Sequence, residues 1–191
     1  MKLCFATTNP GKIKDINTLL SGKLEVVGLK DIGCSEEIEE TEDTMEGNSL
    51  LKAKYVFDHY KINCFADDSG LEVDALNGEP GVYSARYAGP ERDNDANIKL
   101  LLSKLEGVEE RGAQFKSIVT LVMNGEVNQF EGIVRGTIIN EKRGNQGFGY
   151  DPIFMPEGLD RTFAEISIEE KNKMSHRRRA IDQLIEHLKS L

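Results

Sequence analysis

The sequence predicts a mixed α/β fold, in which helices cover the faces of a sheet with parallel and antiparallel strands. In the first half of the chain, apolar strand-like segments alternate with amphipathic helical segments, which is the pattern of βα units. Further on, Asn124-Gly125 lies between two long strand-like segments and is the strongest short-range signal for a hairpin. A chain of 191 residues can build a proper core, and we expect one domain over residues 1–191.

The first segment reads as a strand, a tight loop and a helix. Residues 2–7 form the expected strand, 8–12 the loop and 12–20 the helix, whose apolar side chains share one face. A helix that follows a tight loop directs its backbone N–H groups at one place, which suits a phosphate, and Lys12 adds a cation there. It is not a Walker A loop, because it has one glycine and Ile13 replaces the usual Ser or Thr. The alternative is an ordinary Asn-Pro-Gly turn.

Two adjacent aspartates, Asp67 and Asp68, follow an apolar strand expected at 62–66. Ser69-Gly70 is expected to turn the chain before a second strand at 71–76. Because side chains alternate along a strand, the two carboxylates should point apart, so that one can hold Mg²⁺ or activate water while the other braces the turn. The alternative is an Asx turn in which both cap backbone N–H groups.

The remaining elements follow from hydrophobic periodicity and from turn residues. Further helices are expected at 48–60, 93–105 and 175–188, and further strands at 114–123, 126–130 and 132–139.

A glycine-rich loop at 144–154 contains three glycines and two aromatic residues ahead of an apolar pair. Glycines let a ligand approach the backbone closely, and Phe148 can offer a flat face to a base. The alternative is a glycine-rich turn whose aromatic side chains fold into the core. The loop carries no GxGxxG fingerprint, so a dinucleotide-binding fold is not supported.

The C-terminal helix is expected to begin with a basic turn. Ser175 can cap it, which places His176 and Arg177 in its first turn. Cations at a helix N-terminus oppose the helix dipole, so they cost stability unless an anion is nearby. The alternative is a solvated basic turn, which is weighed most for Arg178 and Arg179.

Composition limits the partners and the compartment. A net charge of −9 without a basic stripe argues against nucleic-acid polymers and anionic membranes as partners. The sequence shows neither a leader pattern nor a long apolar span, so we expect a cytoplasmic protein. Cys4, Cys34 and Cys64 lack metal-site spacing and are expected to be buried free thiols in a reducing cytoplasm. No Ser-His-Asp or Cys-His arrangement is apparent.

Four segments in order, TTNPGK, FADDSGLEVDAL, GFGYDPIF and EKNKMSHR, resemble the inosine triphosphate pyrophosphatase family, also called Ham1-like. The tract PGVYSARYAG is similar to that family as well, and the resemblance spans nearly the whole chain. It implies a long mixed sheet flanked by helices, two lobes with a central cleft, and a homodimer. It also implies Mg²⁺-dependent hydrolysis of ITP, dITP and XTP to the nucleoside monophosphate and pyrophosphate.

The resemblance also implies roles for single residues, carried over by motif position. Asp68 would be the general base and an Mg²⁺ ligand, Glu39 a second ligand, and Ser69 a contact to substrate. Lys171 would reach the phosphates or the base, and His176 with Arg177 would read the base edge. The phosphate-binding residues would be Thr7, Thr8, Asn9, Pro10, Gly11 and Lys12. The nucleoside would be held by Phe148, Gly149, Tyr150 and Asp151.

This assignment suits the chemistry. Cleavage between the α and β phosphorus atoms needs charge neutralisation and an in-line water rather than a strong protein nucleophile. Lys12, Lys171, Arg177 and Mg²⁺ can supply the positive charge, and a carboxylate such as Asp68 can orient and deprotonate the water.

The acidic stretch departs from the family pattern. The family commonly has a glycine soon after the acidic pair and a Glu-Asn start to the next helix, whereas this chain has Glu42 and Gly47-Asn48. Thr44 therefore lacks the glutamate that would complete a capping box. Several other glutamates stand close to Glu39 and remain alternatives for the metal: Glu36, Glu37, Glu40, Glu42 and Glu46.

Two other functions remain open. One is a Maf-like pyrophosphatase for pyrimidine or modified nucleotides, against which the His-Arg pair and the GFGYDP loop speak. The other is a non-catalytic nucleotide-binding protein, against which Asp68, Lys12 and Lys171 speak.

Overall fold

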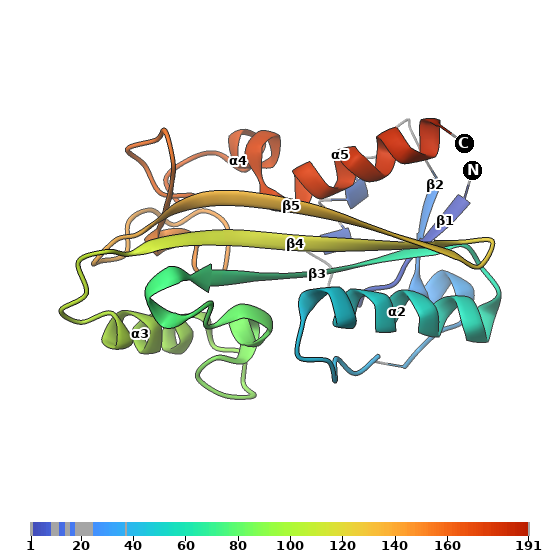
Figure 1. Ribbon diagram of the computed structural model, residues 1–191, viewed down its shortest axis with the longest axis horizontal. Helices are drawn as coiled ribbons and strands as arrows, with labels where there is room; N and C mark the ends of the chain where they lie inside the picture. Colours follow the sequence, from blue (N-terminus) through green and yellow to red (C-terminus); the bar gives the residue numbers. More distant parts are fainter. Residues whose placement is uncertain (1, 9–11, 14–15, 18–24, 37, 191) are drawn as a thin grey trace. The chain divides into compact units, whose positions relative to one another are not determined.

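The computed structural model describes residues 2–8, 12–13, 16–17, 25–36 and 38–190 (Figure 1). The chain divides into two compact units. Unit 1 consists of Met1–Asp68, Ile118–Glu131 and Ala180–Leu191, and unit 2 of Ser69–Ser117 and Gly132–Arg179. Each unit has its own hydrophobic core.

A six-stranded sheet has the order β2-β1-β3-β4-β5-β6. Its strands are β1 (Lys2–Phe5), β2 (Glu25–Gly28), β3 (Cys64–Val73), β4 (Gly112–Met123), β5 (Glu126–Ile138) and β6 (Phe154–Pro156). β1 pairs in parallel with β2 and β3, and β5 pairs antiparallel with β6, so the predicted mixed sheet is confirmed.

The helices are α2 (Met45–Tyr60), α3 (Asn94–Lys104), α4 (Ile168–Met174) and α5 (His176–Lys189). Residues 12, 13, 16 and 17 are helical, as predicted for 12–20, and the rest of that segment lies outside the described residues. The helices predicted at 48–60, 93–105 and 175–188 are confirmed within a few residues, whereas the short α4 was not predicted.

Side chains that alternate along the strands of unit 1 contribute to two different hydrophobic clusters, one on each face of the sheet. Leu3, Phe5 and Phe65 pack with the apolar side of α5, while Cys4 and Cys64 belong to the cluster that α2 covers. Figure 1 shows α2 and α5 on opposite sides of the strands. Because successive side chains of β1 and β3 point to opposite faces, each strand can serve both clusters.

Unit 2 has one core cluster, in which α3 packs against the strands. Ile98, Leu101 and Leu105 come from α3 and its C-terminal end, and they meet the inward side chains of β3, β4 and β5. Phe154, the first residue of β6, and Phe163, which follows β6 in the chain, complete this core. The Phe115 ring of β4 contacts both, edge-on to Phe154 at 4.6 Å and stacked with Phe163 at 6.0 Å between ring centroids.

The hairpin signal is confirmed. β4 and β5 are joined by Asn124 and Gly125, whose φ angles are 53° and 88°. Positive φ at both central residues is what a two-residue type I′ turn requires, and asparagine and glycine tolerate it best. The strands predicted separately at 126–130 and 132–139 are the single strand β5.

The turn predicted at Ser69-Gly70 is wrong. β3 runs as one strand of 10 residues through Asp67, Asp68, Ser69 and Gly70. The Asx-turn alternative fails as well, because the carboxylates of Asp67 and Asp68 bond to the side chains of Lys12 and Asn48. Among the described residues, no helix is long and apolar enough to cross a membrane.

Candidate active-site groups

Asp68 stands on β3 in unit 1 and is nearly enclosed by protein, with 6% of its surface exposed. Its Oδ2 accepts a hydrogen bond of 3.3 Å from Asn48 Nδ2 on α2. Burial raises the pKa of Asp68 from 3.8 to about 6, although the charges of Lys52 and Lys12 act in the opposite direction. A carboxylate with such a pKa can accept a proton near neutral pH, which an ordinary surface aspartate does poorly.

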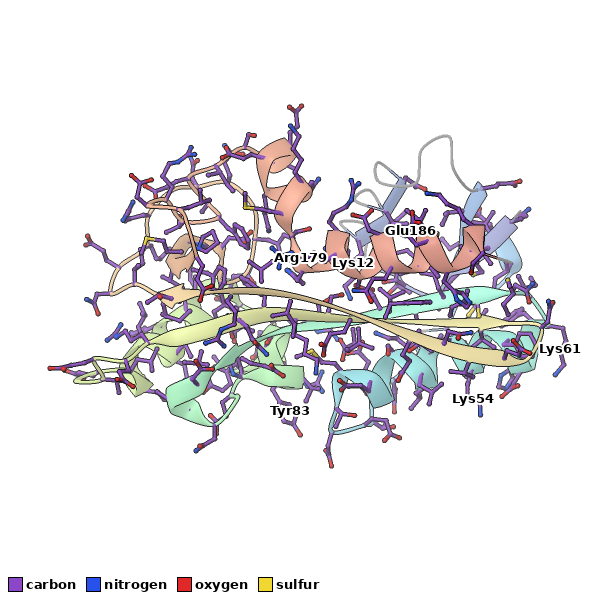
Figure 2. The ribbon with its side chains drawn as sticks, turned by 45° about the horizontal axis from the view of Figure 1, so that its top comes forward. Lys12, Lys54, Lys61, Tyr83, Arg179 and Glu186 are labelled. Carbon is purple, nitrogen blue, oxygen red and sulfur yellow. The ribbon has the colours of Figure 1, made fainter. Side chains whose placement is uncertain are left out.

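The Asp67 carboxylate is bonded by a different part of the chain from the one that bonds Asp68. Its Oδ1 accepts from Lys12 Nζ at 3.0 Å, and Lys12 belongs to the short helical segment that follows β1 (Figure 2). On β3, Asp67 is on the same face as Phe65, which packs with α5. Asp68 is on the same face as Cys64, which α2 covers, and it bonds to Asn48 of α2. The prediction that the two carboxylates point apart is therefore confirmed.

Lys52 is a buried lysine beside both aspartates. Its Nζ donates to the backbone oxygen of Asp67 at 2.8 Å and makes an ion pair with the Glu40 carboxylate. Burial lowers its pKa, but the carboxylates of Asp68, Asp67 and Glu40 raise it above 10.5 on balance. The ammonium therefore stays charged. It links β3, at Asp67, to the acidic segment that precedes α2 and contains Glu39, Glu40 and Glu42.

The glutamates of the acidic segment have different surroundings. Glu40 is half-buried and paired with Lys52, whereas Glu39 is exposed. Glu36 accepts from Tyr55 Oη at 2.5 Å, farther along α2. Glu37 lies outside the described residues. In the part of the chain that the structure describes, no group of three or more His, Cys, Asp or Glu side chains is placed to hold a metal ion.

The predicted phosphate loop is described only in part. Thr7 and Thr8 follow the end of β1, with Thr7 half-buried and Thr8 exposed, and Lys12 is helical. Asn9, Pro10 and Gly11 lie outside the described residues.

Sequence reasoning missed Asn48 and Lys52, although a signal for them was present. The buried face of α2 consists of Met45, Asn48, Ser49, Lys52, Ala53 and Val56, at the spacing of a core-facing stripe. Three of these six positions are polar. A buried polar group needs a partner, so polar residues at core positions indicate a structured network beneath the helix.

In unit 2, Asp151 organises the glycine-rich loop. Its Oδ2 accepts from the Phe148 backbone N–H at 2.9 Å and from Lys171 Nζ at 2.5 Å. Burial raises the pKa of Asp151, opposed mainly by the Lys171 charge and further by Arg177. A Cβ on Gly147, at φ 75°, would overlap this Oδ2, so the turn requires glycine there.

The Lys171 ammonium lies close to two aromatic rings. Its Nζ is 4.8 Å from the centroid of the Phe148 ring and 5.4 Å from that of Phe163. Phe148 is 58% exposed, so its ring offers a flat apolar surface beside a cation. The alternative in which the aromatic side chains of the loop fold into the core is correct for Tyr150, which belongs to the core cluster, and wrong for Phe148.

Tyr150 and Ser69 have mainly internal partners. Tyr150 is buried and its Oη donates to the backbone oxygen of Ser84 at 2.9 Å, and burial raises its pKa. Gly149 has a φ of 59°. Ser69 Oγ donates to Ser117 Oγ at 2.9 Å within the sheet.

His176 and Arg177 lie in the first turn of α5, as predicted, and the structure shows that both are buried. Ser175 Oγ accepts from the Arg178 backbone N–H at 3.2 Å, which confirms it as the cap. The His176 ring stacks on Phe115, with 5.0 Å between centroids and 13° between planes. Arg179 instead is exposed and donates to the backbone oxygen of Ile133 at 2.6 Å (Figure 2). Phe115 and Phe163 were not singled out from the sequence, because apolar positions of this kind read as core.

Comparisons with known proteins identify the family. A model of the Ham1 family matches residues 3–187. The chain is 53% identical to a dITP/XTP pyrophosphatase of Flavobacterium johnsoniae, over 98% of each protein, and 47% identical to one of Bacillus subtilis, over 94% of this chain and 93% of the relative.

Solved structures agree. The structure of a Ham1 protein from Staphylococcus aureus has a TM-score of 0.93 and 42% identity, and covers 100% of this chain and 99% of its own. A HAM1 protein from Coxiella burnetii also has a TM-score of 0.93, at 34% identity and 100% coverage of both chains. The resemblance drawn from the four motifs is thereby confirmed, and the chain belongs to the Ham1 family.

Proposed function

We propose that this enzyme hydrolyses ITP, dITP and XTP to the nucleoside monophosphate and pyrophosphate, and so removes these altered purine nucleotides from the nucleotide pool. Support comes from its relatives, which are named dITP/XTP pyrophosphatases and match nearly the whole chain. The observation that carries the proposal is Asp68: a buried carboxylate that accepts a hydrogen bond from Asn48, lies close to the Lys52 and Lys12 charges, and has in the metal-free protein a pKa raised to about 6.

In the proposed reaction Asp68 takes a proton from a water molecule as the water oxygen bonds to the α-phosphorus. The bond from this phosphorus to the oxygen that bridges it to the β-phosphorus breaks, and pyrophosphate leaves with the electron pair. Lys12, with Thr7, Thr8 and the rest of the phosphate loop predicted from the sequence, would bind the phosphates, since a lysine near the N-terminus of a helix favours anions. Ser69 would add a hydroxyl contact to substrate.

Asp68 and Glu39 would hold Mg²⁺. Magnesium in nucleotide enzymes is commonly bound by one or two carboxylates together with substrate phosphates, and this donor set fits that chemistry. Glu40 in contrast is occupied by the ion pair with Lys52. Bound Mg²⁺ would neutralise charge on the phosphates.

The nucleoside would be recognised by the residues gathered in unit 2. The exposed ring of Phe148 would stack on the base, and Asp151 would fix that ring through the Phe148 N–H and would hold Lys171. His176 and Arg177 would donate hydrogen bonds to the oxygen at position 6 of inosine or xanthosine. In ATP this position carries an amino donor, and an unmatched buried donor costs about 1–3 kcal/mol.

A pyrophosphate-release assay with ITP, XTP, dITP, ATP, GTP and dTTP in Mg²⁺ tests the proposal. We expect kcat/KM for ITP, dITP and XTP to exceed that for ATP and GTP by about ten-fold or more. Preference for dTTP would indicate the Maf-like alternative. Binding of ITP without pyrophosphate release would indicate a nucleotide-binding protein without catalytic activity.

We also propose a cytoplasmic homodimer. The described cysteines Cys4, Cys34 and Cys64 are all free thiols, which fits a reducing compartment. The homodimer is expected from the family resemblance, and light scattering on the purified protein would give the mass of a 21.3 kDa chain or of twice that.

A further inference from the structure

Asn48 uses both polar atoms of its side chain to connect two segments of unit 1. It stands in the first turns of α2, and its side chain is completely buried. Its Nδ2 donates to Asp68 Oδ2 at 3.3 Å, and its Oδ1 accepts from the backbone N–H of Glu42 at 2.9 Å. One amide therefore joins β3 to the acidic segment that precedes α2.

The orientation of this amide is set by its partners. A backbone N–H can only donate, so the Asn48 oxygen must face Glu42. The Asn48 nitrogen must then face Asp68, and a flipped amide would place two donors against each other at Glu42 and two acceptors at Asp68. The amide therefore presents a donor, and not an acceptor, to the Asp68 carboxylate.

Lys52 repeats this connection one helical turn later. It also joins β3, through the backbone oxygen of Asp67, to the acidic segment, through Glu40. Residues four apart on a helix share one face, so Asn48 and Lys52 form two parallel links between the same segments. The segment that carries Glu39 is thus tied to Asp68 through α2.

We propose that Asn48 is a positioning residue for the hydrolysis: it holds the Asp68 carboxylate in one orientation and keeps the acidic segment in register with it. This inference rests on the proposed function of Asp68. A small displacement of a catalytic group can lower a rate by about 100-fold, even when the substrate still binds.

Ser49 provides the matched control. It is the next residue of α2 and equally buried, but its Oγ bonds to the Glu46 backbone oxygen at 3.1 Å and to Thr120 Oγ1 at 2.7 Å. A variant of Ser49 should lose stability in the same helix turn without changing the partners of Asp68.

The experiment compares Asn48→Ala, Asn48→Asp and Ser49→Ala by Tm, and by kcat and KM for ITP. Asn48→Asp keeps the shape and the acceptor for Glu42 but replaces the donor to Asp68, so it remains informative if the alanine variant folds poorly. We expect both Asn48 variants to lose about 100-fold in kcat with KM changed little, and Ser49→Ala to keep kcat within about two-fold. Equal loss of kcat in Asn48→Ala and Ser49→Ala at equal Tm would overturn the proposal.

A crystal structure of the Asn48→Asp variant gives a readout that does not need activity. We expect the Asp68 carboxylate to rotate away from α2 and the Glu42 segment to shift, and an unchanged Asp68 would overturn the proposal. A wild-type protein that releases no pyrophosphate from any nucleotide would instead contradict the proposed function, and the structure of the variant would still decide the positioning role.

Discussion

Replacing Asp68 by asparagine is expected to abolish turnover and, at the same time, to stabilise the metal-free protein. The pKa of Asp68 is raised from 3.8 to about 6, so the native state disfavours the charged carboxylate despite nearby Lys52 and Lys12. A pKa difference of one unit corresponds to about 1.4 kcal/mol, which makes the penalty about 3 kcal/mol at most above pH 7. The amide of the asparagine variant carries no charge and escapes this penalty.

The sign follows from the direction of the shift. A raised carboxylate pKa contributes stability that is present below the unfolded pKa, near 4, and is lost as the pH rises through the native pKa, near 6. The variant lacks this loss, so its advantage over wild type should grow between pH 4 and pH 7. Urea unfolding in EDTA at pH 4, 5, 6, 7 and 8 measures it, and loss of the base should lower kcat by about 10²- to 10⁴-fold.

Asp67→Asn is the matched control, and its stability should change in the opposite direction. Asp67 is 1% exposed, and Lys12 Nζ lies 3.0 Å from its Oδ1. Removing the Asp67 charge takes a close partner away from the Lys12 ammonium, at a cost of about 3 kcal/mol. Asp68→Asn should thus raise the free energy of unfolding, and Asp67→Asn should lower it, although the two substitutions are adjacent and chemically identical. An Asp68→Asn protein that is less stable than wild type at pH 8 in EDTA, or that retains over a tenth of the activity, would refute the reasoning.

Three further predictions concern the metal, the acidic segment and the base. Glu39→Gln should raise the Mg²⁺ concentration that gives half-maximal activity, and an unchanged titration would transfer the role to Glu40 or a neighbour. Gly47→Ala should destabilise the protein despite the better helix propensity of alanine, because its Cβ would lie 2.7 Å from the Cβ of Glu42. In urea unfolding, adding Glu42→Gly should restore part of the lost stability. Additive effects of the two substitutions on the free energy of unfolding would contradict the clash. Arg177→Ala should lower kcat/KM for ITP more than for ATP, and an equal fall would make Arg177 a phosphate contact.

Much of the fold was predictable because its signals are local. The positive-φ turn at Asn124-Gly125, the Ser175 cap and the apolar stripes of α3 and α5 depend on neighbours in sequence. The continuation of β3 through Asp67–Gly70 was not predictable in this way. Gly70 and two aspartates indicate a turn locally, but Lys12 and Asn48, each distant in sequence, bond the carboxylates and allow the strand to continue.

The candidate site residues likewise fall into those that local sequence indicates and those whose role depends on contacts distant in sequence. Asp68, Lys171 and the His176-Arg177 pair stand in motifs whose residue types already suggest phosphate or base chemistry. The supporting groups do not, because their role depends on tertiary contacts. Lys52 reads as an ordinary helix lysine until its contacts with Glu40 and the backbone of Asp67 are known. Phe115 reads as core, and only the fold brings it under His176.

The reactivity of the three cysteines can be used to measure local unfolding of unit 1. Cys4, Cys34 and Cys64 are buried and all belong to unit 1, while unit 2 contains none. Burial raises the pKa of Cys4 and of Cys64 to about 12, so these thiols stay protonated and are poor nucleophiles while the fold is closed. Alkylation by iodoacetamide at pH 8 should therefore proceed only through molecules in which unit 1 has opened. Its rate would measure the local stability of unit 1 in the unmodified wild-type chain, without an introduced label and without interference from unit 2.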